Sequence, residues 1–287
     1  MKYLFLLISI SVLGQSYTVK DKITNQNLSY SNIHFGDSGT YSDENGKFSL
    51  PNNLSLNDTI EISHVGYVKK SILFKNLADF ILLTSKEENL EEVIIYDSDI
   101  ETVNIPKSKS KDSHILVRNY ELLTLLKPEK FKDKTIVSVT FYFDNSKGIK
   151  KHSNDGSSGV RFHFYSLKNG EIDEEIFTSE VLKIKLNNEE QLKLDLLSHN
   201  LKFLSGGVAI GLEYIGTITE SGSISQQNNF LRPKFSKKPN KNYTAKSFQF
   251  FSFDKAKELS PVRIPTDLSN TEFNDDYYLS FDLELIK

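Results

Sequence analysis

The sequence predicts an all-β protein that is made of two β-sandwiches. Short runs of alternating apolar and polar residues recur along the chain, and turns rich in Gly, Asn and Asp separate them. That spacing is typical of packed antiparallel sheets. The chain has 20 Phe and 13 Tyr but no Trp, and aromatic enrichment also favours strands. A polar segment at residues 97–113 divides the strand-like runs into two groups, so we predict a linker there.

Residues 1–14 have the features of a secretory signal peptide. Met1-Lys2 gives a positive start, Tyr3–Val12 is apolar, and Gly14 is the small residue before the expected cut. The apolar run is shorter than the roughly 20 residues that a membrane-spanning helix needs. The chain has no cysteine, which excludes disulfides, thiolate chemistry and a lipoprotein signal. We therefore expect an exported protein of the periplasm or the cell surface, free or associated with the outer membrane.

The first predicted sandwich covers residues 15–96. Asp43-Glu44-Asn45-Gly46 separates two strand-like runs, and Asn-Gly tolerates the positive φ angles of a tight turn, so a hairpin is expected there. Residues 58–65 alternate with period two, as a half-buried strand does. The remaining strands of this sandwich are expected at 17–21, 31–35, 68–74, 80–83 and 93–96.

The order of motifs in this region resembles the carboxypeptidase regulatory-like domain. The resemblance rests on Val19 and Asp21 with the Thr24-Asn25 turn, on Asn32-Ile33, on Thr40, Asp43, Gly46 and Phe48, on Gly66-Tyr67, and on Leu90, Glu92, Val93 and Ile95. It implies a transthyretin-like β-sandwich of the kind found on exported bacterial proteins. The Leu-Glu-Glu-Val tail also resembles the front of TonB-dependent outer-membrane receptors. Such a receptor has a barrel of about 22 strands and a plug, and we expect that this chain is not one.

The second predicted sandwich covers residues 114–287. Strong strand patterns occur at 135–143, 159–165 and 207–214, and weaker ones at 192–196, 248–253 and 277–286. The apolar character of the three strong runs predicts that they form the core. The Phe-rich strands, the Lys168-Asn169-Gly170 turn and the Leu-Glu-Tyr strand resemble a jelly-roll-like module that follows the regulatory-like domain in some exported bacterial proteins. That resemblance implies a fold and no particular biochemical activity.

The charge of the chain and its motifs exclude several classes of function. The net charge is −3, from 35 basic and 38 acidic residues, which gives no reason to expect nucleic acid as a partner. Gly36-Asp37-Ser38-Gly39 is similar to the nucleophile segment of trypsin-like proteases, but no histidine segment of the kind that chemistry needs accompanies it. The six histidines show no i, i+4 spacing of a helical zinc site. We therefore expect no metal, no cofactor and no catalytic residues.

Adjacent acidic residues and two Asn- and Asp-rich turns do not predict catalytic or calcium-binding sites. Adjacent residues on a strand point to opposite faces, so the pair Glu174-Glu175 predicts no shared sugar cleft. Asp43, Asn45 and the loop around Asn154 supply too few oxygen ligands for a full calcium loop. His64 and His163 lie in strand patterns, and we expect them to face solvent or a hydroxyl group.

Any ligand of the second sandwich is expected at its loops. The polar segments 146–158 and 216–246 carry many hydrogen-bond donors, and loops are the usual recognition sites of sandwiches. The candidate ligand-binding residues are Asn154, Asp155, Arg232, Lys234 and Tyr243. The alternative is that these residues are solvated loop side chains.

Two classes of function remain open from the sequence. The favoured hypothesis is a non-catalytic binding or assembly module of the cell envelope, whose partner is an envelope protein or a glycan. The other is a carbohydrate-active protein or hydrolase whose site is built from loops of the C-terminal domain.

Overall fold

The computed structural model describes residues 15–86, 100–104, 115–127, 131–144, 157–185, 190–225, 230–236, 245–253, 260–261, 264–267, 270–274 and 278–286. These residues form β-strands and short 3-10 turns, with no α-helix among them, so the all-β prediction is confirmed. The part of the chain that is described contains no helix long and apolar enough to cross a membrane. The predicted signal peptide, residues 1–14, lies outside the described residues.

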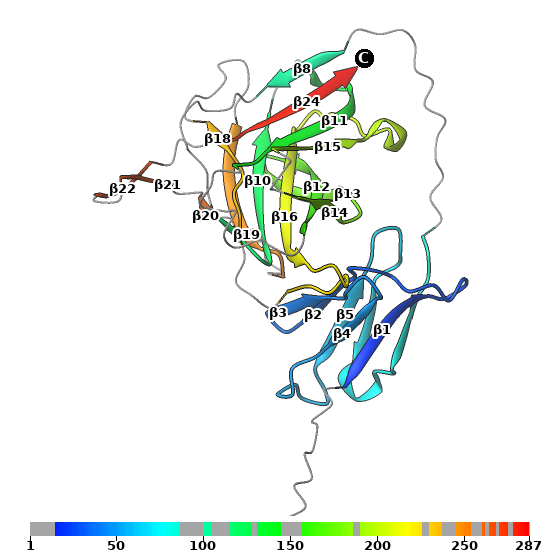
Figure 1. Ribbon diagram of the computed structural model, residues 1–287. Helices are drawn as coiled ribbons and strands as arrows, with labels where there is room; N and C mark the ends of the chain where they lie inside the picture. The colour runs from blue at the N-terminus through cyan, green and yellow to red at the C-terminus, as the bar shows by residue number, and fades with distance from the viewer. Residues whose placement is uncertain are drawn as a thin grey trace, which may run out of the picture. The chain divides into compact units, whose positions relative to one another are not determined.

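The chain divides into two units (Figure 1). The first unit comprises residues 1–36 and 40–85, and the second comprises residues 37–39 and 86–287. Both are built from sheets that pack face to face, which confirms the prediction of β-sandwiches. The jelly-roll-like connectivity expected for the second unit stays a prediction.

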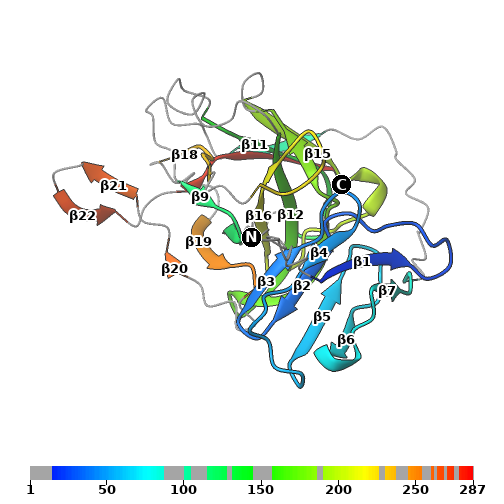
Figure 2. The same ribbon diagram turned by 60° about the horizontal axis from the view of Figure 1, so that its bottom comes forward.

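Seven short strands form two sheets in the N-terminal part of the chain. One sheet has the order β4-β1-β7 and the other has the order β3-β2-β5-β6, and Figure 2 shows β1 and β7 running side by side. The strands are β1 (Ser16–Asp21), β2 (Asn32–Phe35), β3 (Ser38–Tyr41), β4 (Lys47–Ser49), β5 (Thr59–Ser63), β6 (Lys70–Leu73) and β7 (Phe80–Leu83).

The core of this sandwich follows from the alternation of its strands. Val19 of β1, Ile60 and Ile62 of β5, and Ile81 of β7 are all at most 1% exposed. Their neighbours along each strand point the other way, because successive side chains of a strand alternate between faces. The Tyr17 and Phe48 rings stack with their centroids 5.4 Å apart, which ties β1 to β4.

The turn at 43–46 is present, but the strands on its two sides do not pair with each other. Asp43 Oδ1 accepts the backbone N–H groups of Asn45 and Lys47, both at 2.8 Å, and Gly46 has a φ of 71°. β3 belongs to one sheet and β4 to the other, so the hairpin predicted here is wrong. The turn instead connects the two sheets. After it the chain continues as β4, whose Phe48 packs on Tyr17 of β1.

The observed hairpin is one connection earlier, at Gly36-Asp37. β2 and β3 are neighbours in the four-stranded sheet, and these two residues form the turn between them. Gly36 has a φ of 56°, in the left-handed region that a two-residue hairpin turn requires. The Gly-Asp-Ser-Gly segment, which is similar to a protease motif, is thus a turn followed by the start of β3.

The described residues of the second unit form one large sheet, one smaller four-stranded sheet, and the two-stranded pairs β17-β9, β18-β23 and β21-β22. The large sheet has the order β13-β12-β16-β10-β19-β20, and β14 also pairs with β12; the smaller sheet has the order β15-β11-β24-β8. The strands are β8 (Glu101–Asn104), β9 (Leu116–Val117), β10 (Tyr120–Leu126), β11 (Thr135–Tyr142), β12 (Ser157–Lys168), β13 (Glu171–Thr178), β14 (Leu182–Ile184), β15 (Gln191–Asp195), β16 (Val208–Ile218), β17 (Phe230–Leu231), β18 (Phe235–Ser236), β19 (Ala245–Phe251), β20 (Ser260–Pro261), β21 (Ile264–Asp267), β22 (Asn270–Asn274), β23 (Tyr278–Leu279) and β24 (Phe281–Ile286).

The three strong strand patterns form the core of the second unit, as predicted. Phe141 of β11 and Phe162 of β12 face each other with ring centroids 5.1 Å apart, and both are fully buried. Leu212 of β16 belongs to the same cluster. The pairing of β11 with β24 shifts register between Ile136 and Ser138. This irregularity lets both Ile136 and Val139 face the core although they are three residues apart.

Part of the segment predicted to be a linker is a strand. β8 lies within residues 97–113 and pairs antiparallel with β24, with Val103 opposite Leu283. Val103 is 2% exposed and belongs to the core cluster of the second unit, which explains why this stretch is ordered into the sheet. The rest of the predicted linker is described only at Ile100, and the remaining domain boundaries stay predictions.

Candidate functional site

The large sheet of the second unit carries a set of ionisable side chains on the face opposite its core. In β12, Val160, Phe162 and Phe164 point into the core, so Arg161, His163 and Tyr165 share the other face. We call the following six residues the charged network: Glu121, Arg161, His163, Tyr165, Glu175 and Glu213. They lie on four adjacent strands, β10, β16, β12 and β13.

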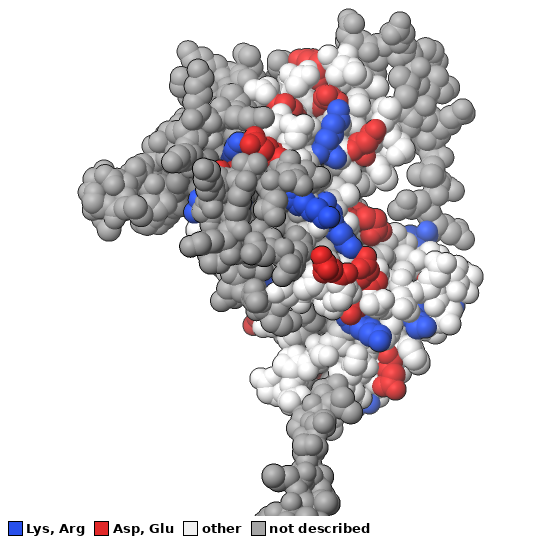
Figure 3. Space-filling model, viewed as in Figure 1, with Lys and Arg blue, Asp and Glu red and all other residues white. Residues whose placement is uncertain are grey.

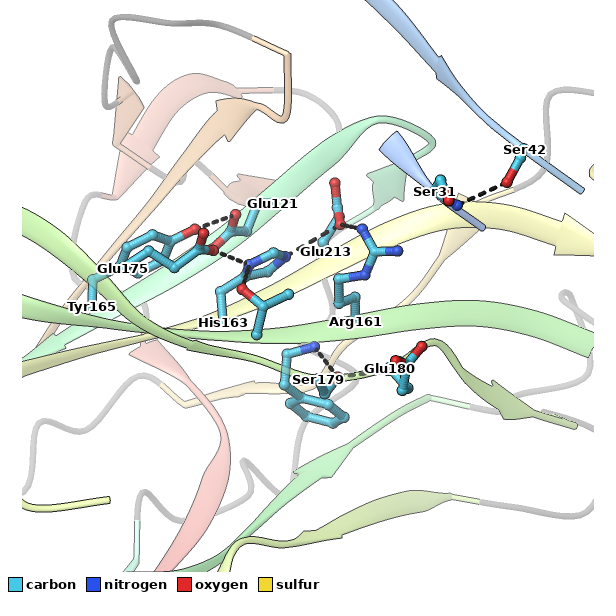
Figure 4. A network of polar contacts seen from close by, with 12 residues as sticks. Ser31, Ser42, Glu121, Arg161, His163, Tyr165, Glu175, Ser179, Glu180 and Glu213 are labelled. Atoms are coloured by element: carbon cyan, nitrogen blue, oxygen red, sulfur yellow. Dashed lines mark hydrogen bonds and ion pairs between the residues drawn. The ribbon is translucent and has the colours of Figure 1, made fainter. Parts of the chain in front are cut away.

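His163 is at the centre of the charged network (Figure 4). Its Nδ1 lies 2.6 Å from Glu175 Oε1, and its Nε2 lies 3.2 Å from Glu213 Oε2. Thr178 Oγ1 is 3.3 Å from the same Nδ1. A histidine whose two ring nitrogens both face carboxylates is an imidazolium that donates both of its N–H groups.

Arg161 and Tyr165 extend the network on either side of His163. Arg161 Nη1 lies 3.4 Å from Glu213 Oε2, so Glu213 is shared by two cations. The hydroxyl of Tyr165 donates to Glu121 Oε2 at 3.0 Å. Every one of these contacts joins different strands, so the network ties the register of the sheet together.

Glu121 and Glu213 stand directly opposite each other on β10 and β16. Two like charges at opposed positions of a sheet repel. The sheet avoids this because Glu213 points towards Arg161 and His163, whereas Glu121 reaches over Gly211 to the hydroxyl of Tyr165. A glycine at position 211 is what leaves room for that carboxylate.

Burial and charge fix the protonation state of this site. Burial by itself lowers the pKa of His163, but the carboxylates of Glu121, Glu175 and Glu213 outweigh it and raise the pKa to about 10. Burial raises the pKa of the Tyr165 hydroxyl well above its usual value, and the negative charge of Glu121 raises it further. At neutral pH the histidine is therefore a cation and the tyrosine a neutral phenol, so His163 is not available as a general base.

The charged network was not predicted from the sequence. The hydroxyl contact expected for His163 is present, since Thr178 Oγ1 lies 3.3 Å from its Nδ1. The side chain is nevertheless 6% exposed and lies between two carboxylates, which we did not expect. The signal that would have revealed it is the alternation of Arg161, His163 and Tyr165 with apolar residues in one strand, since it marks a second, polar face. For His64 the expectation is confirmed, because its Nδ1 lies 3.1 Å from the hydroxyl oxygen of Ser31.

The structure brings together two of the five candidate ligand-binding residues. Arg232 and Lys234 lie between β17 and β18, and the backbone N–H of Lys234 donates to the Tyr142 carbonyl oxygen at 2.8 Å. Both side chains have acidic neighbours: Arg232 Nη1 is 3.9 Å from Asp144, and Lys234 Nζ is 3.7 Å from Glu190. Asn154, Asp155 and Tyr243 lie outside the described residues.

The predicted loop 216–246 contains more regular structure than expected. β16 continues to Ile218, and β17, β18 and the start of β19 fall within the same range.

On the face of the second unit drawn in Figure 3, basic and acidic side chains of the described residues are interspersed. Groups of three or more His, Cys, Asp or Glu that could hold a metal ion do not occur among the described residues.

Comparison with known proteins identifies one part of the chain. Residues 17–95 match the family model described as a CarboxypepD_reg-like domain. Comparisons with curated proteins and with solved structures gave no match. The matched range covers the strands β1 to β7, whose sandwich is described above. Residues 17–95 of this chain therefore form a carboxypeptidase regulatory-like domain, as the order of their motifs predicted.

Proposed function

We propose that this protein is an exported, non-catalytic binding or assembly module of the bacterial cell envelope. The regulatory-like domain supports this proposal, because it belongs to a non-catalytic family. The start of the chain supports export, since Met1-Lys2 and the apolar run Tyr3–Val12 have the pattern of a secretory signal.

One observation favours binding over catalysis in the second unit. Its buried ionisable groups hold one another in fixed protonation states: His163 as a cation between two carboxylates, and Tyr165 as a phenol bonded to Glu121. Closed networks of this kind make a sheet rigid and specify its register. A rigid sheet that presents its edges and loops is a scaffold for recognition.

The proposed partner is an envelope protein or a glycan, at the periplasm or the cell surface. Within the second unit, the proposed contact region is the segment around Arg232 and Lys234, together with Asn154, Asp155 and Tyr243. Arg232 lies 5.7 Å from the ring centroid of Phe230, so a cation and an aromatic face occur side by side in this segment. Such a pair suits both a sugar ring and a protein surface.

Export and envelope association are tested by expressing the full chain with a C-terminal tag in a bacterium that has an outer membrane. We expect mass spectrometry of the recovered protein to show cleavage after Gly14 and fractionation to place it in the envelope or the medium. A variant without residues 2–14 is the control and is expected to stay in the cytoplasm. Recovery of uncleaved wild-type chain from the cytoplasm would contradict the proposal.

Binding is tested by chemical cross-linking in the same cells, followed by purification under denaturing conditions. We expect a discrete cross-linked species that contains one envelope protein or a glycan. If the exported chain gives only its own monomer at every cross-linker length, it is not a binding or assembly module.

A further inference from the structure

The outward face of β7 exposes apolar side chains beside lysines. β7 is the last strand of the sheet β4-β1-β7 among the described residues, and it pairs in parallel with β1. Just after its end, the backbone N–H of Val68 donates to the Thr84 carbonyl oxygen at 2.8 Å. Ile81 and Leu83 point into the core, whereas Phe80 is 60% exposed and Leu82 is 39% exposed. Neighbouring apolar side chains that are exposed on one face of a folded protein can mark an interaction site.

Positive charge surrounds these two apolar residues. Lys20 of β1 stands opposite Leu82, and its ammonium group lies 5.0 Å from the centre of the Phe80 ring. On the other side of β7, Lys70 of β6 donates from Nζ to the Leu82 carbonyl oxygen at 3.0 Å. The two lysines thus bracket β7.

Acidic residues do not balance this charge on the outward face of the three described strands. The register of β4, β1 and β7 places Lys47, Thr18 and Phe80 in one row and Lys20 with Leu82 in the next. Asp79 directly precedes β7 and lies two residues before the core-facing Ile81. Its place in the strand alternation is therefore that of the core-facing side and not of the outward face. The outward face is therefore apolar at β7 and basic around it.

We propose that β7 and the lysines that bracket it bind an extended segment of a partner protein that carries apolar residues at its centre and acidic residues at its ends. The apolar side chains of that segment cover Phe80 and Leu82, and its carboxylates pair with Lys20 and Lys70. Side chains make this contact, because the Leu82 carbonyl oxygen already accepts from Lys70. The apolar contact supplies buried area, and the charges supply selectivity. This inference rests on the proposed function, since it names the chemistry of one partner of a binding module.

The test uses the full chain without its predicted signal peptide and a fluorescein-labelled peptide of about ten residues, a length typical of a strand. The peptide has a central Val-Thr repeat flanked by Glu, and a second peptide has Lys in place of each Glu. Fluorescence anisotropy is expected to show saturable binding of the Glu peptide and about tenfold weaker binding of the Lys peptide.

Two double variants separate the charged from the apolar contribution. Lys20→Glu with Lys70→Glu is expected to weaken binding of the Glu peptide about tenfold and to favour the Lys peptide, because attraction becomes repulsion. Phe80→Ser with Leu82→Ser is expected to weaken both peptides about tenfold, because the apolar contact is lost. The matched control is Lys75→Glu with Lys168→Glu, which has the same charge change at exposed positions outside β1, β6 and β7 and is expected to bind as the wild type does.

Circular dichroism of each variant checks that the fold is kept, as expected for substitutions on an outward face. No saturable binding of the Glu peptide, or equal affinity of all variants, would overturn the assignment of this surface. Cross-linking to an envelope partner in cells would still support the proposed function in that case, so the two failures can be told apart.

Discussion

The side chain of Glu121 occupies the space above Gly211 that any larger residue would need. A Cβ atom at Gly211 would lie 1.8 Å from Glu121 Oε1 and 2.8 Å from its Cδ. Glu121 belongs to β10 and its partner Tyr165 to β12, with β16 between them. The absence of a side chain at Gly211 therefore allows a carboxylate to reach across one strand to the next.

The first prediction concerns this pair of residues. Gly211→Ala is expected to lower the free energy of unfolding by about 1–3 kcal/mol, because it forces a buried carboxylate to move. In a Glu121→Ala background the same substitution is expected to cost less, because there is no carboxylate to displace. Urea denaturation of the four proteins measures the difference. An equal cost in both backgrounds would show that Glu121 does not fill this space in solution.

The second prediction is a dependence of stability on pH. The pKa of His163 is raised from 6.5 to about 10 in the folded protein. Because the folded value is the higher one, the imidazolium stabilises the fold most below pH 6.5, and this contribution is lost as the pH rises towards 10. We expect the free energy of unfolding of the wild type to fall across this range, and that of His163→Gln to fall less steeply.

Two further measurements isolate His163 from other effects. His199→Gln is the matched control, because His199 lies outside the charged network, and its slope is expected to follow the wild type. Nitrogen-15 NMR of the imidazole rings is expected to show His163 still doubly protonated at about pH 8. A neutral His163 ring at that pH would contradict the assignment of an imidazolium.

The third prediction tests the core of the second unit. Phe162→Ala is expected to lower the free energy of unfolding by about 3–5 kcal/mol, because it removes a fully buried ring that packs on Phe141. Val117→Ala, at a residue that is 45% exposed, is expected to change it by less than about 0.5 kcal/mol. Similar losses in both variants would mean that β12 is not central to the core.

The fourth prediction concerns the polar segment at residues 97–113. Limited proteolysis of residues 15–287 is expected to cleave within the predicted linker 97–113 but outside β8, whose backbone is paired with β24. Mass spectrometry of the fragments locates the sites. Cleavage between Glu101 and Asn104 in the native protein would show that β8 is not stably paired.

The fifth prediction concerns the proposed contact region of the second unit. A Lys234→Ala, Tyr243→Ala double variant is expected to lose most of any binding on a glycan array or in a partner screen. Lys193→Ala is the control, because Lys193 also forms an ion pair, at 2.8 Å with Glu284, but lies on β15. Unchanged binding by the double variant would show that this region is not the binding site.

Strand positions were the part of the fold that the sequence predicted best. Val139, Phe141, Phe162 and Leu212 lie in apolar runs with clear breaks on both sides, and all of them are in the core. Pairing was harder to predict, because a turn sequence such as Asp43–Gly46 fixes the local backbone and does not specify which strands meet. Gly36-Asp37 is the shorter connection, and it makes the hairpin.

The charged network shows why the candidate site was harder to predict. Arg161 and Glu213 are opposite each other only because β12 pairs with β16 in one particular register. Glu121 comes from β10, which is distant in the sequence, whereas Glu175 comes from β13, the strand directly after β12. Sequence analysis finds side chains that share a strand face, but contacts across four strands follow from the sheet order, which local patterns do not determine.

The pairing of β24 with both β11 and β8 has a consequence for how the protein folds. β24 lies between β11 and β8 in its sheet, yet it is the last strand of the second unit in sequence order. The backbone hydrogen bonds of β8 and of one edge of β11 are made to β24. They cannot form until that distant segment has been synthesised and has reached the sheet. Contacts of such long sequence separation slow folding. We therefore expect the pairing of β11, β24 and β8 to form late in the folding of the second unit.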